Sequence, residues 1–172
     1  MTEQPMVSGP PSPCAVSKAA QMPDFRVIVT GSRTWPDEAA VWLALNRVAW
    51  RDVPMSGTLT VIQGACPTGA DAAAAAWYGQ VRRSGNDPVI GRDLRLREEP
   101  HPADWKRHGR RGGPIRNQEM VDLGADLVLA FVMPCTLKGC AGKPEHVTHG
   151  TQDCIPRAEK AGIPVWRITE RG

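Results

Sequence analysis

Three short glycine-containing turns in this sequence have residue types that could bind an anion. Glycine lets an anion approach the backbone closely, and a helix that begins at such a turn directs its first N–H groups at the anion. An arginine in the turn could add a forked pair of hydrogen bonds. The candidate residues are Gly31, Ser32 and Arg33 in the first turn, Gly64, Ala65, Gly69 and Asp71 in the second, and Gly150 and Thr151 in the third. One glycine pair alone would indicate only a tight turn, whereas three turns at one edge of a sheet would outline a nucleotide-sized pocket.

A fourth group of candidates lies in a cationic segment between Arg92 and Arg116, where Lys and Arg outnumber Asp and Glu. For most of these side chains a solvated charged surface is an equally good interpretation. Arg116 and Asn117 differ because they follow two glycines and Pro114 in the first turn of a predicted helix. A guanidinium and an amide there could contact a phosphate or a ribose. Asp71 also lies in a first helical turn, where it could complement the helix dipole or orient a ribose hydroxyl or a loop amide.

Two cysteines and two histidines, Cys135, Cys140, His146 and His149, lie close together in one glycine- and proline-containing segment. Two thiolates and two imidazoles are the ligands of a tetrahedral structural zinc site, and the segment has too few apolar side chains to order itself otherwise. The spacing of these residues is irregular for such a site. The alternatives are a reduced, flexible loop whose His149 flanks the anion pocket, or a direct contact between His149 and the ligand.

The elements that must position these residues alternate between strands and helices. Apolar, β-branched runs predict strands, and apolar residues at helical spacing predict helices. We expect strands at residues 25–31, 59–64, around 94–97, 126–133 and 164–168, and helices at 37–50, 68–83, 114–124 and 151–162. Strict alternation of this kind predicts an α/β fold, a Rossmann-like three-layer sandwich with a mainly parallel sheet. In such a sheet ligands bind at the carboxyl ends of the strands, which is where the glycine turns fall.

Length and composition limit the classes that remain. The 172 residues suffice for one domain, and a net charge of +3 is too small for a nucleic-acid coat or a polybasic membrane binder. Residues 1–24 are proline-rich and predict a flexible tail before a domain over residues 25–172, which contains the Cys/His insertion at 134–149. We expect a cytoplasmic protein with reduced thiols, because the chain has no membrane-length apolar run, no leader pattern and an odd number of cysteines. The sequence leaves open whether the chain forms a homo-oligomer.

Four segments of the sequence resemble one known superfamily. They are VIVTGSR, GACPTGAD, DWKRHGRRGGPIRNQEM, and the final HGT turn with its following AGIPV. Together they are similar to the SLOG superfamily, in particular its YspA-like, cpYpsA-related branch, which is common in bacteria and their phages. The most specific element is Gly113-Pro114-Ile115-Arg116-Asn117 with Met120. The resemblance implies a Rossmann-like domain that binds a nucleotide or a nucleotide-derived phosphate ligand, as a sensor or as a processing protein.

Two relatives in that superfamily supply alternative functions. The LOG enzymes, which are nucleoside-monophosphate N-glycosidases (phosphoribohydrolases), use an Arg and a Glu; Arg116 matches the Arg, but Cys154 stands in place of the Glu. A glycosidase needs a carboxylate, so Asp153, one position earlier, is the substitute if the protein is an enzyme. The DNA-processing protein DprA binds single-stranded DNA with the same fold. Trp105, which lies among basic residues, could supply a stacking platform of that kind or could pack against the sheet.

Overall fold

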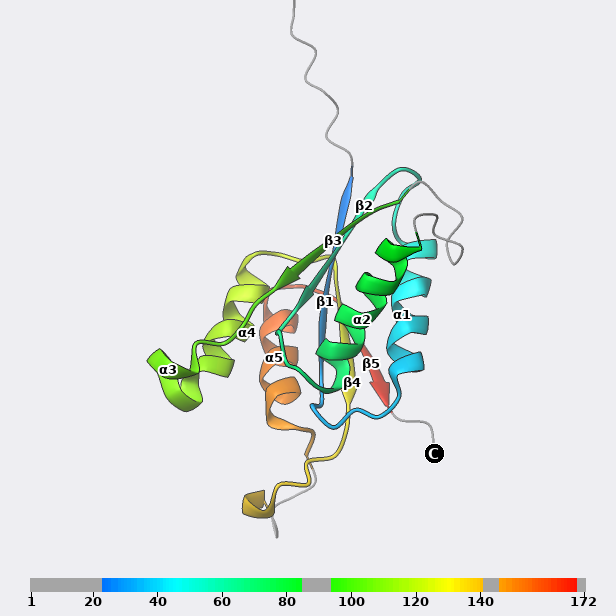
Figure 1. Cartoon of the computed structure of the whole chain (residues 1–172). Coiled ribbons are helices and arrows are strands. Elements are labelled where there is room, and N and C mark those ends of the chain that lie inside the picture. The colour runs from blue at the N-terminus through cyan, green and yellow to red at the C-terminus, as the bar shows by residue number, and fades with distance from the viewer. Residues whose placement is uncertain (1–22, 85–93, 141–145, 170–172) are drawn as a thin grey trace, which may run out of the picture.

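The computed structural model describes residues 23–84, 94–140 and 146–169, which form one parallel sheet with helices on both faces (Figure 1). The predicted tail lies outside the described residues except for Pro23 and Asp24, and Asp24 already belongs to the first strand. The sheet order is β3-β2-β1-β4-β5, and every neighbouring pair is parallel. The strands are β1 (Asp24–Gly31), β2 (Thr58–Gln63), β3 (Arg95–Pro100), β4 (Leu127–Val132) and β5 (Val165–Thr169). The predicted Rossmann-like α/β fold is confirmed.

The helices form the two outer layers of the sandwich. On one face lie α1 (Glu38–Arg51) and α2 (Gly69–Arg83), and on the other lie α4 (Gly112–Asp122) and α5 (His149–Lys160). Shorter turns are α3 (Trp105–His108), η1 (Gly109–Arg111) and η2 (Lys138–Cys140). Asp37 caps α1, where its Oδ1 accepts a hydrogen bond from the backbone N–H of Ala40 (2.8 Å). Among the described residues no helix is both long and apolar enough to cross a membrane.

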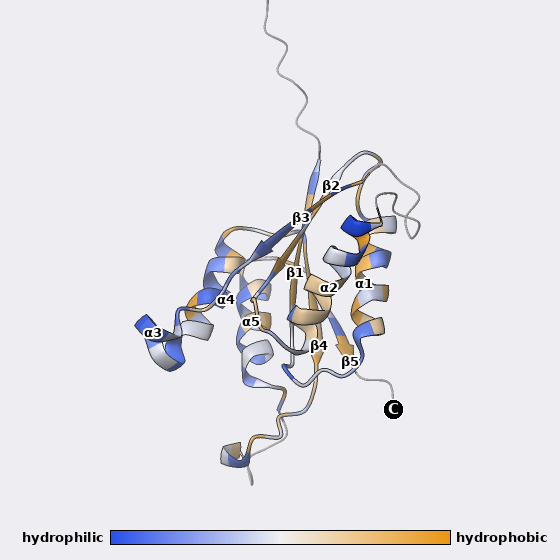
Figure 2. Ribbon diagram, in the orientation of Figure 1, coloured by the Kyte–Doolittle hydropathy of each residue, from blue (hydrophilic) through white to orange (hydrophobic). Residues whose placement is uncertain are grey.

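Alternate residues of the central strands feed two separate hydrophobic cores. In β1, Val27 and Val29 pack with α1 and α2, whereas Ile28 packs with α4 and α5. Both sets are fully buried, as expected for a parallel strand covered on both faces. Figure 2 shows hydrophobic central strands, helices of mixed hydropathy, and a largely hydrophilic edge strand β3. The cores hold the carboxyl ends of β1, β2 and β4 at fixed positions.

The strand β3 forms one edge of the sheet and differs from the central strands in composition. Its sequence is RLREEP, and Arg95 and Arg97 are exposed. Glu99 pairs with Arg26 of β1, whose two terminal nitrogens donate to its two carboxylate oxygens at 3.0 and 2.7 Å. β3 therefore attaches to the sheet through backbone pairing, this ion pair and the packing of Leu96 against the core, while its exposed side chains include Arg95 and Arg97.

Several element boundaries differ from the sequence prediction for identifiable reasons. α4 begins at Gly112, before Pro114, because the first N–H groups of a helix have no partner in the helix and proline loses nothing there. α5 begins at His149, so Gly150 lies inside its first turn instead of preceding the helix. Thr68 is the N-cap residue of α2, but its side chain makes no capping hydrogen bond. β3 also extends beyond the predicted strand end, as far as Pro100.

Candidate functional site

The turns after β1 and β2 meet at the carboxyl edge of the sheet. The Ser32 N–H donates to the Phe131 carbonyl oxygen at the end of β4 (3.2 Å), and the Ser32 carbonyl oxygen accepts from Ala70 N–H in α2 (3.3 Å). This edge includes the place between β1 and β4 where the strand order changes direction, and ligands bind at such switch points in open α/β sheets. The predicted first and second glycine turns are therefore neighbours.

Two glycines make this close approach possible. Gly69 has a positive φ of 72°, and a Cβ there would lie 2.1 Å from the Ser32 carbonyl oxygen. A Cβ on Gly31 would lie 2.6 Å from the Cβ of Ala70 and 2.8 Å from that of Phe131. Both glycines thus let the start of α2 pack against the end of β1. They determine the backbone shape of the site.

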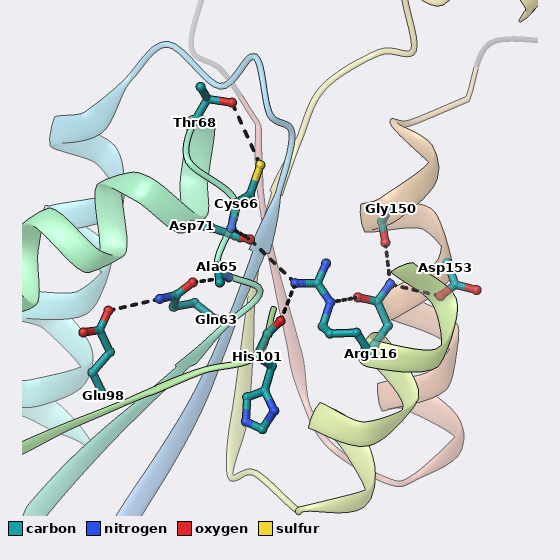
Figure 3. Close-up of polar contacts among 11 residues, drawn as sticks. Gln63, Ala65, Cys66, Thr68, Asp71, Glu98, His101, Arg116, Gly150 and Asp153 are labelled. Carbon is teal, nitrogen blue, oxygen red and sulfur yellow. Dashed lines mark hydrogen bonds and ion pairs between the residues drawn. The ribbon is translucent and has the colours of Figure 1, made fainter. Parts of the chain in front are cut away.

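Arg116 extends from α4 toward Asp71 and the β2–α2 turn (Figure 3). Its guanidinium lies directly over Gly64. A Cβ on Gly64 would be only 1.3 Å from Arg116 Nη1. The guanidinium is held by Nε donating to Asn117 Oδ1 (3.0 Å) and Nη1 donating to the His101 carbonyl oxygen (3.4 Å), and the side chain is 15% exposed. In the part of the chain that the structure describes, Nη2 has no hydrogen-bond acceptor. Because Gly64 has no side chain, the Arg116 guanidinium fits at this position, and its Nη2 can donate to a ligand.

Asp71 is the buried anion opposite this guanidinium. Its Oδ2 lies 3.9 Å from Arg116 Nη1 and accepts a hydrogen bond from the Cys66 backbone N–H (3.3 Å). Burial raises the pKa of Asp71, while Arg116 and backbone hydrogen bonds from Cys66 and Gly64 lower it by a smaller amount. Asp71 therefore fixes the loop amides of the β2–α2 turn and partly balances the charge of Arg116.

The same turn contains a non-glycine residue in the left-handed region. Ala65 has a φ of 53°, and its N–H donates to the Gln63 side-chain oxygen (2.5 Å). Gln63 in turn donates to Glu98 of β3 (3.0 Å). Strained residues of this kind persist where the surrounding structure holds them, and they cluster at binding sites. Ala65 is among the residues that the sequence predicts for the site, whereas Gln63 and His101 are not. Their signals in the sequence are only that Gln63 precedes Gly64 and that His101 follows the last residue of β3.

The pKa of Asp71 leads to a pH-dependent prediction for Asp71→Asn. A raised native pKa means that the folded state binds the proton more tightly than the unfolded state, whose pKa is near the ordinary value of 3.8. The wild-type protein should therefore lose stability relative to Asp71→Asn as the pH rises from 3.8 through the native pKa, and the difference should then level off. Urea unfolding across this range measures it. The control is Asp37→Asn, because asparagine can keep the exposed helix cap at that position. Equal pH profiles of stability for wild type and Asp71→Asn would contradict the prediction.

Asn117 links Arg116 to the third predicted turn. Its side-chain amide is buried, and Nδ2 donates to the Gly150 carbonyl oxygen (3.2 Å) and to Asp153 Oδ2 (3.0 Å). Asp153 also accepts two hydrogen bonds from Arg157 (2.9 and 2.8 Å). The predicted ribose contact Asn117 and the predicted substitute carboxylate Asp153 are thus both engaged within the protein. Their arrangement holds α5 against α4 and orients the Arg116 guanidinium.

The predicted hydroxyl contacts also have partners inside the fold. Ser32 Oγ lies 2.8 Å from Thr34 Oγ1 and accepts from the Thr34 N–H (3.1 Å), and Thr151 is buried with its hydroxyl 3.1 Å from that of Thr148. Arg33 points toward α3, where its guanidinium lies over the Trp105 ring, 5.6 Å from the centroid. In the glycine turn after β1, Arg33 is therefore an exposed cation, whereas the Ser32 hydroxyl is bonded within the protein.

Cys154 limits the chemistry that this edge can perform. Burial raises the pKa of its thiol to about 11, and a hydrogen bond with Thr30 offsets part of that effect. The thiol is thus neutral near pH 7 and cannot act as the carboxylate that a LOG-type reaction uses. The neighbouring carboxylate of Asp153 already accepts hydrogen bonds from Arg157 and Asn117. Neither Cys154 nor Asp153 therefore offers an unengaged carboxylate of the kind that a LOG-type reaction uses.

The four predicted metal ligands are brought together beside the start of α5. The sulfur atoms of Cys135 and Cys140 and one ring nitrogen each of His146 and His149 all lie within 4.8 Å of one another. This cluster is separate from the Arg116 edge but connected to it by α5, whose first residue is His149.

An all-parallel sheet with glycine turns and a fixed arginine at its carboxyl edge defines a Rossmann-like α/β protein. A sequence model of the YspA, cpYpsA-related SLOG family matches residues 25–83, which span β1 to α2. The chain is also similar to the Gene 61 protein of Mycobacterium phage D29, with 38% identity over 140 residues that cover 81% of this chain and 93% of the relative. The chain belongs to the YspA, cpYpsA-related SLOG family. No solved structure matches it.

Proposed function

We propose that this protein binds a nucleotide or a nucleotide-derived phosphate ligand at the carboxyl edge of its sheet. The observation that carries the proposal is the Arg116 guanidinium, which is fixed over Gly64 and keeps Nη2 without an acceptor among the described residues. A phosphate can accept hydrogen bonds from such a group, and a partly buried position strengthens them. Membership of the SLOG family supports a nucleotide-related ligand.

The charges around Arg116 are consistent with an anionic ligand. Asp71 balances part of the Arg116 charge but lies 3.9 Å away, so it leaves the guanidinium free for a second, closer partner. The α2 N-terminus lies at the same edge and contributes the positive end of its dipole. Arg33, which lies over Trp105, could turn toward a second phosphate of a longer ligand.

Native mass spectrometry of the freshly purified chain, followed by calorimetry with a ligand panel, tests this proposal. The panel contains nucleoside mono-, di- and triphosphates, a dinucleotide, and a nucleoside without phosphate. We expect at least one phosphate ligand to bind more than about tenfold tighter than the nucleoside, because charge-assisted hydrogen bonds typically contribute about 1.5–3 kcal/mol. Equal binding of nucleoside and nucleotides, or binding of none of them, would contradict the proposal. Free base released in the same incubations would instead support the N-glycosidase alternative.

A single-stranded DNA ligand is a second candidate, favoured by the surroundings of Trp105. This side chain is 49% exposed, lies under Arg33, and is followed in sequence by Lys106 and Arg107. Aromatic stacking and nearby cations are the means by which proteins bind single strands. A labelled oligodeoxynucleotide therefore belongs in the panel at low and high salt. Binding that weakens steeply with salt and requires Trp105 would support this candidate, and no binding at low salt would exclude it.

A further inference from the structure

We propose that Cys135, Cys140, His146 and His149 bind one Zn²⁺ ion in a tetrahedral structural site. Nothing in the family assignment or in the proposed ligand site calls for a metal. The proposal is carried by the position of the four side chains, whose candidate ligand atoms all lie within 4.8 Å of one another. Two sulfur and two nitrogen ligands are one of the usual sets for structural zinc.

The strongest evidence is the crowding of polar atoms around His149 Nε2. This nitrogen lies 3.1 Å from His146 Nε2, 3.2 Å from Cys140 Sγ and 3.8 Å from Cys135 Sγ. A neutral imidazole nitrogen has either one proton or one lone pair, so it can form one good hydrogen bond and not three. A cation at the centre of the four atoms would satisfy all of them at once.

The three separations measured from His149 Nε2 lie close to those that a zinc ion would impose. Bond lengths of about 2.0–2.1 Å to nitrogen and about 2.3 Å to sulfur place ligand atoms of a tetrahedron about 3.4 Å apart for two nitrogens and about 3.6 Å apart for nitrogen and sulfur. The observed distances of 3.1, 3.2 and 3.8 Å from His149 Nε2 fall on both sides of these values. Side-chain adjustments that also close the widest separation, which is up to 4.8 Å, would complete the coordination.

The backbone explains how ligands with irregular spacing come together. Pro134 and Val147 form an antiparallel bridge, and the Cys135 N–H donates to the His146 carbonyl oxygen (2.7 Å), which places these two ligands side by side. The η2 turn returns Cys140 toward them, with its N–H donating to the Leu137 carbonyl oxygen (2.8 Å). His149 enters from α5. The spacing that looked irregular in sequence is thus the spacing of a short bridged loop that ends on a helix.

The described part of this loop packs few apolar side chains into either core. η2 lies beyond the start of α5, away from the sheet (Figure 1), and Leu137 is exposed instead of packed in a core. Metal binding commonly supplies the folding free energy for such segments. Because the protein would fill all four positions, the ion would have a structural role and no open position for a substrate. Thiolate and imidazole ligands also favour Zn²⁺ over Mg²⁺ or Ca²⁺.

Zinc at this position would also fix the start of α5. The residue after His149 is Gly150, whose carbonyl oxygen accepts from Asn117, and Asn117 in turn accepts from Arg116. Loss of the metal should therefore loosen the support of the Arg116 guanidinium. This consequence, unlike the zinc site itself, rests on the proposed ligand-binding function.

Metal analysis of the protein purified under reducing conditions without chelator tests the zinc site. We expect one zinc per chain, and after exchange with Co²⁺ the strong visible bands of tetrahedral cobalt with a thiolate charge-transfer band. Cys140→Ser and His149→Ala should each lower zinc affinity by at least the about 10–100-fold that loss of a second-shell partner costs, since they remove a direct ligand. Cys66→Ser and His108→Ala change the same residue types outside the cluster and should keep the metal. A zinc-free wild type that does not take up added zinc, or that contains a Cys135–Cys140 disulfide, would overturn the proposal.

Thermal unfolding with and without a chelator provides a second measurement. The chelator should lower the melting temperature of the wild type and of Cys66→Ser, but not that of Cys140→Ser, whose circular dichroism reports whether the variant is folded. An equal shift in Cys140→Ser would show that the cluster is not the site of the metal. If zinc binds and no nucleotide does, the proposed function fails while the zinc site stands. If a nucleotide binds and zinc does not, only the zinc site fails.

Discussion

Replacing Arg116 with alanine is expected to weaken binding of the phosphate ligand by about 100-fold, as measured by calorimetry. The guanidinium is held by Asn117 and by the His101 carbonyl oxygen, so its free Nη2 is oriented before the ligand arrives. Two charge-assisted hydrogen bonds from an oriented group contribute about 3 kcal/mol in total, which corresponds to that loss. The same change leaves the buried Asp71 without its cation, which should raise the pKa of that carboxyl further.

Arg116→Lys separates the loss of the guanidinium from the loss of its charge. Lysine keeps a cation opposite Asp71 and should preserve folding, but it cannot form the fork and should still weaken binding by more than about tenfold. Arg47→Ala removes a guanidinium that lies over Trp166, 5.4 Å from the ring centroid, and serves as the control with unchanged affinity. Undiminished ligand binding by a folded Arg116→Ala would disprove the placement of the ligand at this edge.

Gly69→Ala is expected to destabilise the fold by about 3 kcal/mol, measured by urea unfolding. Alanine at a φ of 72° is strained, which costs about 1–3 kcal/mol. The new Cβ would also lie 2.1 Å from the Ser32 carbonyl oxygen, and relieving that overlap requires α2 to move away from the end of β1. Ligand affinity should fall with the loss of stability, because the turns of the site separate.

Gly79→Ala in the same helix is the matched control and should have the opposite sign. Gly79 lies inside α2, and a Cβ there would meet only the flexible end of Arg83, 3.3 Å away. Alanine in a helix interior is favoured over glycine by about 0.5–1 kcal/mol, so this variant should be slightly more stable than the wild type. Equal effects at the two positions would mean that the backbone contact at Gly69 does not hold α2 in place.

The fold could be predicted from the sequence because its signals are local. Apolar runs such as that of β4 and the helix start at Asp37 depend on neighbouring residues, and strict alternation of elements then determines a parallel sheet. Helix starts were less predictable. α4 and α5 each begin two residues before the predicted position, since Pro114 and Gly150 are tolerated in a first turn.

The contacts of the candidate site depend on residues far apart in the chain, and so the sequence could name its members but not their roles. Gly64 was predicted as an anion contact, whereas its lack of a side chain makes room for Arg116. Asn117 was predicted to meet a ribose, whereas its amide joins α4 to α5. No local pattern contains either relationship. Ligand contact by the predicted residues stays a prediction, as does metal binding by the cysteines and histidines.

The charged outer strand β3 has a consequence for how copies of this chain can meet. An open strand edge is a template for intermolecular pairing, and natural proteins block it with charged side chains. If another strand paired with β3, it would lie beside the exposed Arg95 and Arg97 and the ion-paired Glu99. Pairing would remove water from these charged side chains. Growth of the sheet from this edge into fibrous aggregates is therefore less favourable than from an apolar edge. Within the described residues, β5 forms the other edge of the sheet.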